Sequence, residues 1–363
     1  MNVRVELGAR SYDIHIGSGT LGQAGRAIAA AGPGRRALLV TDGHVADNHA
    51  PLLASSLHAA GIATQMVVVP PGERSKSLEA AARLYDACID CGLDRGSWIV
   101  ALGGGVVGDL AGFVAATFLR GIAFVQVPTT LQAQLDASVG GKVAVDHPRG
   151  KNLIGAFHQP RLVWCDVGTL ATLPRPELVA GMTEAIKHGL LASPAYYRFM
   201  RRQREALLAL DPRAMARLVS GSCRIKAAVV ASDEREESGA RATLNLGHTL
   251  GHALEAVAGF GTLRHGEAVA IGLVAAGRLA RLRGTWSQRW QAELEALLTE
   301  YGLPTRIPGL PLGEILSVMH LDKKARAGQL RWVLPQRPGS VALAADVPVA
   351  DVQAVLVALG AVA

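Results

Sequence analysis

Aromatic residues, cysteines and long apolar runs are scarce in this chain of 363 residues. Aromatic side chains make up only 4% of the residues, which argues against an aromatic-lined surface for nucleic-acid bases. The four cysteines fit a reducing compartment rather than a disulfide framework. No uninterrupted apolar run is long enough to cross a bilayer, and Val3 to Leu7 alternates like a strand rather than a signal peptide. We therefore expect a soluble, cytoplasmic protein with no membrane partner.

The net charge of +7 invites a nucleic-acid interpretation. Against it, the arginines are spread along the chain, and their one cluster comprises Arg198, Arg201, Arg202 and Arg204. A small anionic substrate explains the basic balance equally well. We expect no nucleic-acid partner.

Lysine is also rare: of the 37 basic residues, 7 are Lys and 30 are Arg. Lysine differs from arginine where a compact ammonium group must contact a phosphate or where the pKa must shift. The few lysines are therefore candidate site residues, although a biased codon usage could leave some at random. They lie in segments rich in Gly, His, Asn or carboxylates: Lys76, Lys142, Lys151, Lys187, Lys226, Lys323 and Lys324.

The chain length suggests two domains. Up to residue 168, short apolar strands alternate with Ala-rich helical stretches, which predicts a Rossmann-like α/β domain with a parallel sheet. Residues 169–363 show helical periodicity and predict a mainly helical domain. We expect the ligand site in a cleft between the two. The predicted strands include 37–41, 64–69, 98–102 and 122–127, and the predicted helices include 80–89, 177–191, 214–231, 248–258, 267–283 and 290–301.

A glycine cluster, Gly103 to Asp109, follows a predicted strand and opens a helix. Glycines there allow backbone N–H groups to approach a phosphate at a helix N-terminus. The pattern is not G-x-G-x-x-G, so a tight turn with close helix packing explains it equally well. Asp42, after an earlier strand, is a candidate for a ribose hydroxyl or simply a turn-forming Asp-Gly.

A second constellation contains histidines and a carboxylate. His248 and His252 are four residues apart and share one helix face, His265 follows, and Glu184 lies on another helix beside Lys187 and His188. Two or three histidines with one carboxylate form a zinc set that leaves an open position for catalysis. Spacing alone leaves open which of His248 and His252 binds, and isolated helical histidines are often structural.

A third group supplies donors for phosphate or carboxylate oxygens. Individually, each could be an ordinary solvated charge. They are Lys142, Lys151, Asn152, Arg120, Arg241 and Asn245. A lone C-x-x-C, Cys88 and Cys91, has no second pair and lies in a predicted helix, so we expect neither a redox nor a zinc role for it.

Taken together, these motifs resemble the 3-dehydroquinate synthase family nearly end to end. The resemblance is carried by residues 101–110, 128–130, 134–142, 150–157, 184–187, 245–249, 265–267 and 322–324. It implies a dinucleotide domain joined to a helical metal-binding domain, and a homodimer. It also implies a lyase of aromatic amino-acid biosynthesis (the shikimate pathway) that converts 3-deoxy-D-arabino-heptulosonate 7-phosphate, a sugar-acid phosphate, to 3-dehydroquinate and phosphate. The implied steps are transient oxidation by NAD, phosphate elimination, re-reduction and an intramolecular aldol reaction.

The resemblance also assigns roles. Glu184, His248 and His265 match the ligands of one divalent metal, zinc or cobalt, and His252 matches a proton-transfer residue. The implied NAD contacts are Asp42, Glu73, Lys76, Gly105, Val106, Val107, Gly108, Asp109, Thr129, Thr130, Lys142, Lys151, Thr169 and Thr172. The implied substrate contacts are Asp136, Lys142, Asn152, Lys187, Lys226, Arg241, Asn245 and Lys324 (or Lys323), with Arg120 contributed by the neighbouring subunit. Lys142, Asn245, Lys187 and Arg241 are counted with His252 as catalytic.

Three positions depart from the family pattern: Pro71, Ala137 and Val143 replace the usual Asp, Ser and Thr. Pro71 lies near the expected adenosine end of the cofactor, whereas Ala137 and Val143 remove hydroxyls close to catalytic groups without deleting a ligand or a charge. Two other functions stay open. A related sugar-phosphate cyclase, such as a 2-deoxy-scyllo-inosose or aminodehydroquinate synthase, would share the NAD and metal motifs, and a metal-dependent polyol dehydrogenase would share the architecture.

Overall fold

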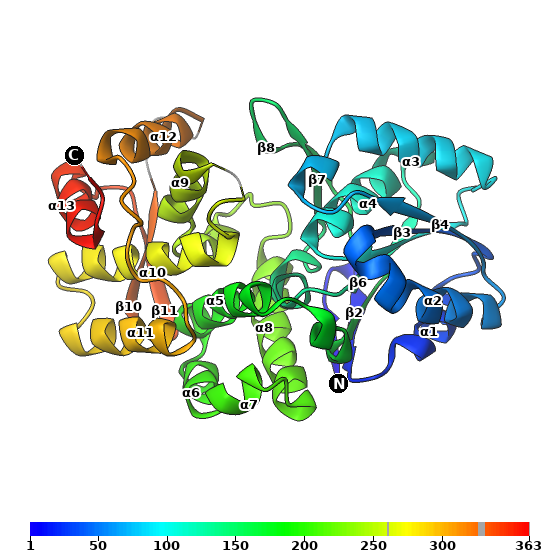
Figure 1. The fold of residues 1–363 in the computed structure, drawn as a ribbon, viewed down its shortest axis with the longest axis horizontal. Helices are drawn as coiled ribbons and strands as arrows, with labels where there is room; N and C mark the ends of the chain where they lie inside the picture. The colour runs from blue at the N-terminus through cyan, green and yellow to red at the C-terminus, as the bar shows by residue number, and fades with distance from the viewer. Residues whose placement is uncertain (260, 326–330, 363) are drawn as a thin grey trace. The chain divides into compact units, whose positions relative to one another are not determined.

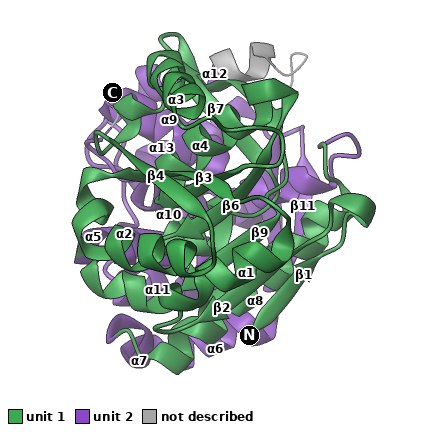
Figure 2. Ribbon diagram, turned by 90° about the vertical axis from the view of Figure 1, so that its right-hand side faces the viewer, with its two compact units in different colours: residues 1–174, 210–235 green, residues 175–209, 236–363 purple. Residues whose placement is uncertain are grey.

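The structure is a computed structural model, and it describes residues 1–259, 261–325 and 331–362. These residues form two compact units, shown in different colours in Figure 2. Unit 1 comprises residues 1–174 and 210–235, and unit 2 comprises residues 175–209 and 236–363. The division is not a single cut, because the segment 210–235 belongs with the first unit. A domain boundary at residue 168 stays a prediction.

Unit 1 is built on a seven-stranded sheet with the order β1-β2-β9-β6-β5-β3-β4 (Figure 1). Only β1 is antiparallel to its neighbour; β2, β9, β6, β5, β3 and β4 are parallel. Parallel strands end at one edge of a sheet, so their carboxyl ends gather there. The strands are β1 (Asn2–Val5), β2 (Tyr12–Gly17), β3 (Arg36–Asp42), β4 (Ala63–Val69), β5 (Trp98–Gly103), β6 (Ala123–Pro128) and β9 (Leu162–Asp166).

Helices complete unit 1, together with a hairpin of β7 (Lys142–His147) and β8 (Gly150–Phe157). Short 3-10 turns include η3 (Glu73–Ser75), η4 (Phe118–Arg120) and η6 (Val167–Thr172), and η5 (Ala133–Ala137) is a π-helix. The α-helices are α1 (Ala24–Ala31), α2 (Gly43–Ala59), α3 (Leu78–Asp90), α4 (Gly105–Thr117) and α8 (Pro212–Ser232).

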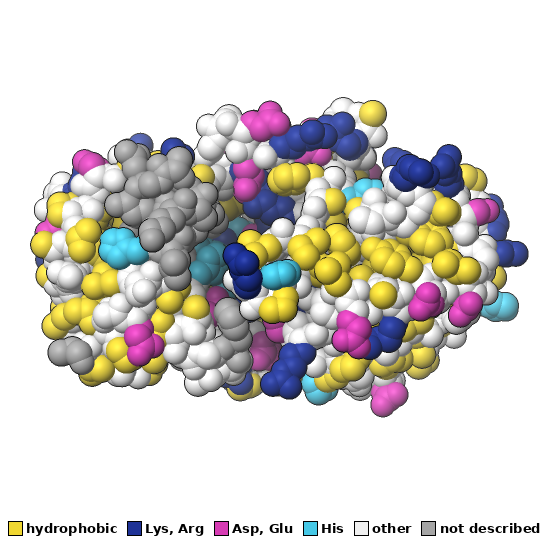
Figure 3. Space-filling model, turned by 90° about the horizontal axis from the view of Figure 1, so that it is seen from above, with side chains coloured by type: hydrophobic (Ala, Val, Ile, Leu, Met, Phe, Trp, Pro, Cys, Tyr) yellow, Lys and Arg dark blue, Asp and Glu magenta, His cyan; other side chains and the backbone are white. Residues whose placement is uncertain are grey.

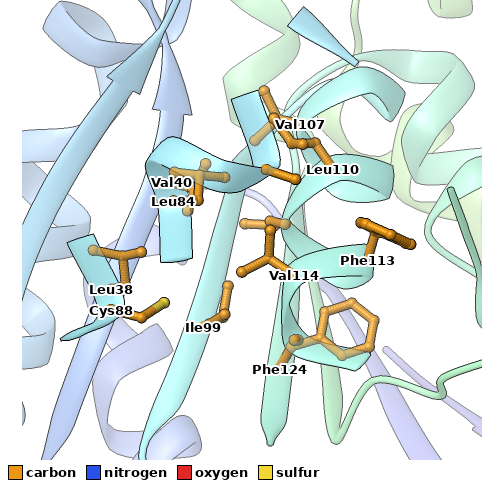
Figure 4. Packing of buried hydrophobic residues seen from close by; sticks show 14 of the residues in the cluster. Leu38, Val40, Leu84, Cys88, Ile99, Val107, Leu110, Phe113, Val114 and Phe124 are labelled. Atoms are coloured by element: carbon orange, nitrogen blue, oxygen red, sulfur yellow. The ribbon is translucent and has the colours of Figure 1, made fainter. Parts of the chain in front are cut away.

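The sheet of unit 1 is buried on both faces because its strands are apolar on both sides. Along β3, Leu38 and Val40 join one core cluster with α3 and α4, whereas Ala37 and Leu39 join the other with α1 and α2. This alternation follows from the two-residue period of a strand. Figure 4 shows the first cluster, in which Phe124 lies among aliphatic side chains. Burying each leucine-sized side chain contributes about 1.5–3 kcal/mol, which holds the carboxyl ends of the strands in place.

Unit 2 is mainly helical, as the periodicity predicted. A hairpin of β10 (Trp332–Arg337) and β11 (Ser340–Ala344) packs against α5 and α10, and the pattern gave no sign of it. The helices are α5 (Arg175–Ala192), α6 (Pro194–Arg202), α7 (Arg204–Leu208), α9 (His248–Ala258), α10 (His265–Leu282), α11 (Gln288–Glu300), α12 (Leu312–Ala325) and α13 (Val349–Leu359), with the 3-10 helix η7 (Ala240–Asn245) before α9.

The predicted strands and helices are confirmed to within a few residues, and the fold class, a mostly parallel sheet followed by helices, is confirmed. Within the residues that the structure describes, no helix is both long and apolar enough to cross a membrane. On the face seen in Figure 3, the Lys and Arg side chains of the described residues stand in several groups, with acidic and apolar side chains among them.

Candidate active site

Three side chains from three helices of unit 2 converge on one point. Glu184 lies on α5, His248 is the first residue of α9, and His265 is the first residue of α10. The Nε2 atoms of both histidines lie 3.6 Å from Glu184 Oε1. The three residues can each offer a ligand atom within 4.8 Å of the others. The structure thus brings the three predicted metal ligands together.

Glycines, which have no side chain, let helices α9 and α10 approach each other closely. A Cβ atom on Gly272 of α10 would lie 1.9 Å from the carbonyl oxygen of Gly247, the residue before α9. A Cβ atom on Gly251 would lie 3.2 Å from the backbone of Val269. Because real Cβ atoms do not approach a carbonyl oxygen this closely, glycine at 272 permits the contact between α9 and α10 that sets His248 beside His265.

Hydrogen bonds at Nδ1 orient both imidazole rings. His248 Nδ1 lies 3.2 Å from the carbonyl oxygen of Leu246, and His265 Nδ1 lies 2.8 Å from Glu255 Oε2. A carbonyl or carboxylate oxygen only accepts, so each Nδ1 carries the proton that is donated. The Nε2 atoms, directed toward Glu184, are then the nitrogens available as ligands. Sequence reasoning missed Glu255, whose only signal was its position seven residues after His248.

The donor set fits a divalent cation. Ligands about 2.0–2.2 Å from a tetrahedral ion are roughly 3.3–3.6 Å apart, which matches the Nε2–Oε1 separations of 3.6 Å. Two imidazole nitrogens with one carboxylate oxygen suit zinc or cobalt and leave a position for substrate. The second oxygen, Glu184 Oε2, lies 2.5 Å from Lys187 Nζ, which directs the first toward the histidines.

The pKa values of the two histidines beside Glu184 shift in opposite directions. Burial lowers the pKa of His265, but Glu184 and Glu255 outweigh burial and raise this pKa to about 9. Burial, with the ammonium group of Lys187 adding to it, holds the pKa of His248 well below its usual value. The two carboxylates therefore stabilise a cation at this point, either a proton on His265 or a metal ion.

His252 lies beside the cluster and is exposed, unlike His248 and His265. Its ring centroid is 5.3 Å from that of His248 and 5.9 Å from that of His265. It can also join Glu255 and His265 in a second possible ligand group, so geometry keeps open the question that spacing raised. His188 is fully buried on α5, one turn after Glu184.

In unit 1, the turn between β5 and α4 is the predicted phosphate site. Gly104 caps α4 without a side chain, and a Cβ atom there would lie 3.0 Å from Thr130 Cγ2. The first N–H groups of a helix lack intrahelical acceptors and suit a phosphate. Gly105, Val106, Val107, Gly108 and Asp109 all lie in the first turns of this helix. The residues fit a dinucleotide, and their role in binding it stays a prediction.

Buried Lys76 and half-buried Asp109 form an ion pair beside this turn. Lys76 Nζ lies 2.6 Å from Asp109 Oδ2 and also donates to Asn152 Oδ1. Burial raises the pKa of the Asp109 carboxyl, and the Lys76 ammonium group opposes this. Glu73, in the same 3-10 turn as Arg74 and Ser75, pairs with Lys151 at 3.6 Å. Residues implied to bind cofactor and substrate thus contact one another in unit 1.

A buried glutamine joins two neighbouring strand ends. Gln134 Nε2 lies 3.0 Å from the carbonyl oxygens of Pro128 and Asp166, at the ends of β6 and β9, and 3.3 Å from Thr169 Oγ1. Gln134 is fully buried. It therefore holds η6, which carries Thr169 and Thr172, against the end of β6. Sequence reasoning placed Gln134 in a motif without giving it a role.

The predicted threonines lie at the same strand ends. Thr129 N donates to the carbonyl oxygen of Gly103, and Thr130 Oγ1 accepts from Ala133 N. Thr172 Oγ1 lies 2.8 Å from Nε2 of His49, a residue of α2 that sequence reasoning missed. Asp42 accepts hydrogen bonds from His44 N and Val45 N and so caps α2, which agrees with the turn-forming interpretation, while its ribose role stays a prediction.

The remaining predicted substrate residues divide between the units. In unit 1, Lys226 Nζ lies 2.9 Å from Asp136 Oδ2, and Lys142 is exposed at the start of β7. In unit 2, Arg241 is buried with its Nε 3.7 Å from Glu236 Oε1. Asn245 ends η7, and Arg120 is exposed with a φ of 68° at the end of η4. Lys323 and Lys324 lie in the last turn of α12, and their side chains fall outside the described part of the structure.

The C-x-x-C pair is part of the core. Cys88 is buried, and burial raises its pKa to about 12. Cys91 Sγ donates to Gln65 Oε1 at 3.0 Å. All four cysteines are free in the structure.

Comparison with known proteins decides the family. Models described as the 3-dehydroquinate synthase N-terminal and C-terminal domains match residues 66–180 and 181–325. The 3-dehydroquinate synthase of Desulforamulus reducens is 49% identical to the chain over 98% of the chain and 99% of the relative. The chain belongs to the 3-dehydroquinate synthase family.

Solved structures of related cyclases share the family fold. A 2-deoxy-scyllo-inosose synthase complexed with carbaglucose-6-phosphate, NAD+ and Co2+ has a TM-score of 0.90 and 25% identity, covering 98% of this chain and 99% of its own. The 2-epi-5-epi-valiolone synthase from Streptomyces hygroscopicus, with NAD+ and Zn2+ bound, has a TM-score of 0.89 and 26% identity, covering 98% of this chain and 97% of its own.

Proposed function

We propose that the chain is a 3-dehydroquinate synthase, a phosphorus-oxygen lyase that converts 3-deoxy-D-arabino-heptulosonate 7-phosphate to 3-dehydroquinate and phosphate. The observation that carries the proposal is the 49% identity to a 3-dehydroquinate synthase across 98% of the chain. The site chemistry supports it, because the described residues include side chains that could hold a metal ion, a glycine turn suited to a phosphate and basic groups suited to an anionic substrate.

The metal ion of this proposal is held by Glu184, His248 and His265, whose donor atoms already face one another. Glu184, His248 and His265 would hold a divalent ion that would supply Lewis-acid chemistry at the substrate C5 hydroxyl, and NAD held by unit 1 would supply reversible hydride transfer at C5. The buried ammonium of Lys187, 2.5 Å from Glu184 Oε2, keeps this carboxylate oriented. Lys187 is also proposed to contact substrate oxygens.

NAD binding is assigned to the strand ends of unit 1. The backbone N–H groups of the glycine turn before α4 would donate to the pyrophosphate, and Asp42 would hold a ribose hydroxyl. The remaining proposed contacts are Glu73, Lys76, Gly105, Val106, Val107, Gly108, Asp109, Thr129, Thr130, Lys142, Lys151, Thr169 and Thr172.

Proton transfer at C5 is assigned to His252, assisted by Asn245. An exposed imidazole beside the proposed metal ligands is suited to act as a general acid or base. Basic groups neutralise the phosphate and carboxylate of the substrate and so hold its reactive centre in one orientation. The basic groups are Lys142, Lys187, Lys226, Arg241 and Lys324, with Asp136 orienting Lys226, and the amide of Asn152 adds a neutral hydrogen-bond donor.

A different cyclase activity is the main competing function, because the inosose and valiolone synthases share the fold at 25% and 26% identity. The higher identity to a dehydroquinate synthase, 49%, favours that reaction. A dehydrogenase would accumulate NADH, whereas a cyclase returns the hydride to its substrate.

The proposal is tested by incubating the purified protein with the heptulosonate phosphate, NAD+ and Zn2+ or Co2+. We expect phosphate and dehydroquinate to form in equal amounts without net NADH. Glu184→Gln is the matched inactive control. Formation of NADH without phosphate would favour a dehydrogenase, and turnover of glucose 6-phosphate alone would favour an inosose synthase.

We also propose a cytoplasmic homodimer in which Arg120 reaches the phosphate pocket of the partner. The exposure of Arg120 supports this, because an exposed arginine is available to a second copy. Arg120→Ala and Glu184→Gln should each be inactive alone, and mixing them under exchange conditions should restore activity. Mixtures that stay inactive while exchanging subunits would place Arg120 in its own subunit's site.

A further inference from the structure

Glu255 is a buried carboxylate for which the proposed mechanism has no role. It lies on α9, seven residues after His248, and only 7% of its surface is exposed. Its neighbours in the chain, Ala253 and Leu254, are buried apolar residues. Removing a carboxylate from water costs several kcal/mol, so it is retained where charge-assisted hydrogen bonds offset that cost. The hydrogen bond of Glu255 to His265 is therefore a reason for its presence.

The contact fixes the ring of His265. Glu255 Oε2 lies 2.8 Å from Nδ1, and the carboxylate can only accept, so Nδ1 donates. With Nδ1 held, rotation of the ring is restricted and Nε2 faces Glu184 Oε1 at 3.6 Å. His248 receives the same support from a neutral acceptor, the carbonyl oxygen of Leu246 at 3.2 Å. A charged acceptor makes the imidazole a stronger ligand than a neutral one does.

A direct ligand role for Glu255 is less consistent with the geometry. In that arrangement His265 Nδ1 and Glu255 Oε2 would both bind one ion. Their separation of 2.8 Å is a hydrogen-bond distance, shorter than the roughly 3.3–3.6 Å between two ligands of a tetrahedral ion. The pair is therefore a donor and an acceptor.

We propose that Glu255 is a positioning residue that selects the Nδ1–H form of His265 and aims its Nε2 at the metal. The inference rests on the proposed function, because it assumes the metal site of Glu184, His248 and His265. It adds to that site a carboxylate that is hydrogen-bonded to a metal-binding histidine, with Glu255 on α9 and His265 on α10.

The test is the Zn2+ affinity of metal-free Glu255→Gln, measured by competition with a chromogenic chelator. We expect binding roughly 10–100-fold weaker than in the wild type, the usual effect of losing such a partner. The tetrahedral Co2+ absorption bands should shift as well, which a merely structural role would not cause. Glu293→Gln is the matched control, since Glu293 of α11 forms ion pairs with Arg201 of α6 and Arg289 of α11. It should bind both metals as the wild type does.

A wild-type Zn2+ affinity and Co2+ spectrum in Glu255→Gln would overturn the inference while leaving the metal site intact. If the wild type bound Zn2+ no more tightly than Glu184→Gln, that result would instead refute the proposed metal site. Should Glu255→Gln not fold, 15N spectra of His265 in the zinc-loaded wild type decide the matter. A proton on Nδ1 with Nε2 bound to metal supports the inference, and the reverse arrangement overturns it.

Discussion

The carbonyl oxygen of Ala180 lies 1.9 Å from the position that a Cβ atom on Gly266 would occupy. Ala180 is one turn before Glu184 on α5, and Gly266 follows His265 at the start of α10. The approach of these two backbones therefore sets the distance between a carboxylate and an imidazole of the candidate metal site.

Gly266→Ala should displace α10 from α5, because neither backbone can yield locally. We expect a loss of stability on the order of 3 kcal/mol and weaker Zn2+ binding. Urea unfolding and chelator competition measure the two effects. Gly313→Ala is the control: nothing lies within 4 Å of its Cβ position on α12, so the variant should be at least as stable as the wild type. Equal behaviour of the two variants would contradict the packing argument.

Lys76→Met should leave the Asp109 carboxylate without its cation. Removing one partner of a buried pair costs on the order of 3 kcal/mol, and here the Lys76 side chain is only 6% exposed. We also expect weaker NAD binding, since the pair lies beside the turn before α4. The double variant Lys76→Met with Asp109→Leu should recover part of the stability in thermal unfolding. A double variant less stable than Lys76→Met would argue against an unpaired charge as the cause.

His252→Ala should retain Zn2+ and lose turnover, because His252 lies beside the ligand cluster and is assigned to proton transfer. The zinc content after dialysis and the rate of phosphate release give the two readouts. Full loss of zinc would make His252 a ligand, in line with the group it can form with Glu255 and His265.

Gln134→Met should separate η6 from the end of β6. The substitution keeps the size of the side chain but leaves the carbonyl oxygens of Pro128 and Asp166 without the Nε2 donor, at a cost of about 2 kcal/mol. NAD affinity, measured by fluorescence titration, should fall with stability. Gln132→Met, at a partly exposed neighbouring position, is the control and should change neither quantity.

Stability should decline in mild acid, in part because of His158. Burial lowers the pKa of His158, which stacks on Phe124 and contacts the carbonyl oxygen of Ile122 at 2.8 Å. Below about pH 6.5 the unfolded chain binds a proton that the folded protein resists, so stability falls as pH drops toward the lower folded pKa. His158→Phe should flatten the loss in urea unfolding between about pH 6.5 and 5. An unchanged slope would show that other groups, such as His15 and His49, carry the effect.

The sequence predicted those elements whose residues alternate or repeat strongly. The strand Trp98–Gly103 is buried throughout, and α9 begins at His248 as its spacing indicated. The β10–β11 hairpin was missed because its residues share no clear period, and it is stabilised by packing against α5 and α10. Local pattern is a weak guide where tertiary packing decides the structure.

Candidate ligands could be named from residue type and order, but their supports could not. Glu255 looks like any helical carboxylate until α10 places His265 Nδ1 2.8 Å away. The role of Gln134 likewise becomes visible only in the fold, where β6 and β9 end beside its side chain. Both depend on contacts between residues distant in the chain, which spacing along the sequence does not encode.

The structure also explains two departures from the family pattern. Val143 is buried in the core cluster with Phe124, so a hydroxyl at this position would face apolar side chains. Ala137 Cβ lies 3.5 Å from the Cβ position of Gly105 and makes only van der Waals contact with the start of α4. The structure gives no reason for Pro71, which is exposed.

The assignment of residues 210–235 to unit 1 has a consequence for how the protein matures. Helix α8 packs against β1 and β2, which lie far earlier in the chain. Unit 1 therefore cannot be complete on the ribosome until residue 235 has emerged, by which time residues 175–209 of unit 2 have also been made. Until α8 is synthesised, the nascent α/β unit therefore exposes the apolar surface that α8 later covers. Chaperones that bind exposed apolar surfaces should bind arrested chains that end before α8 far more than chains that include α8.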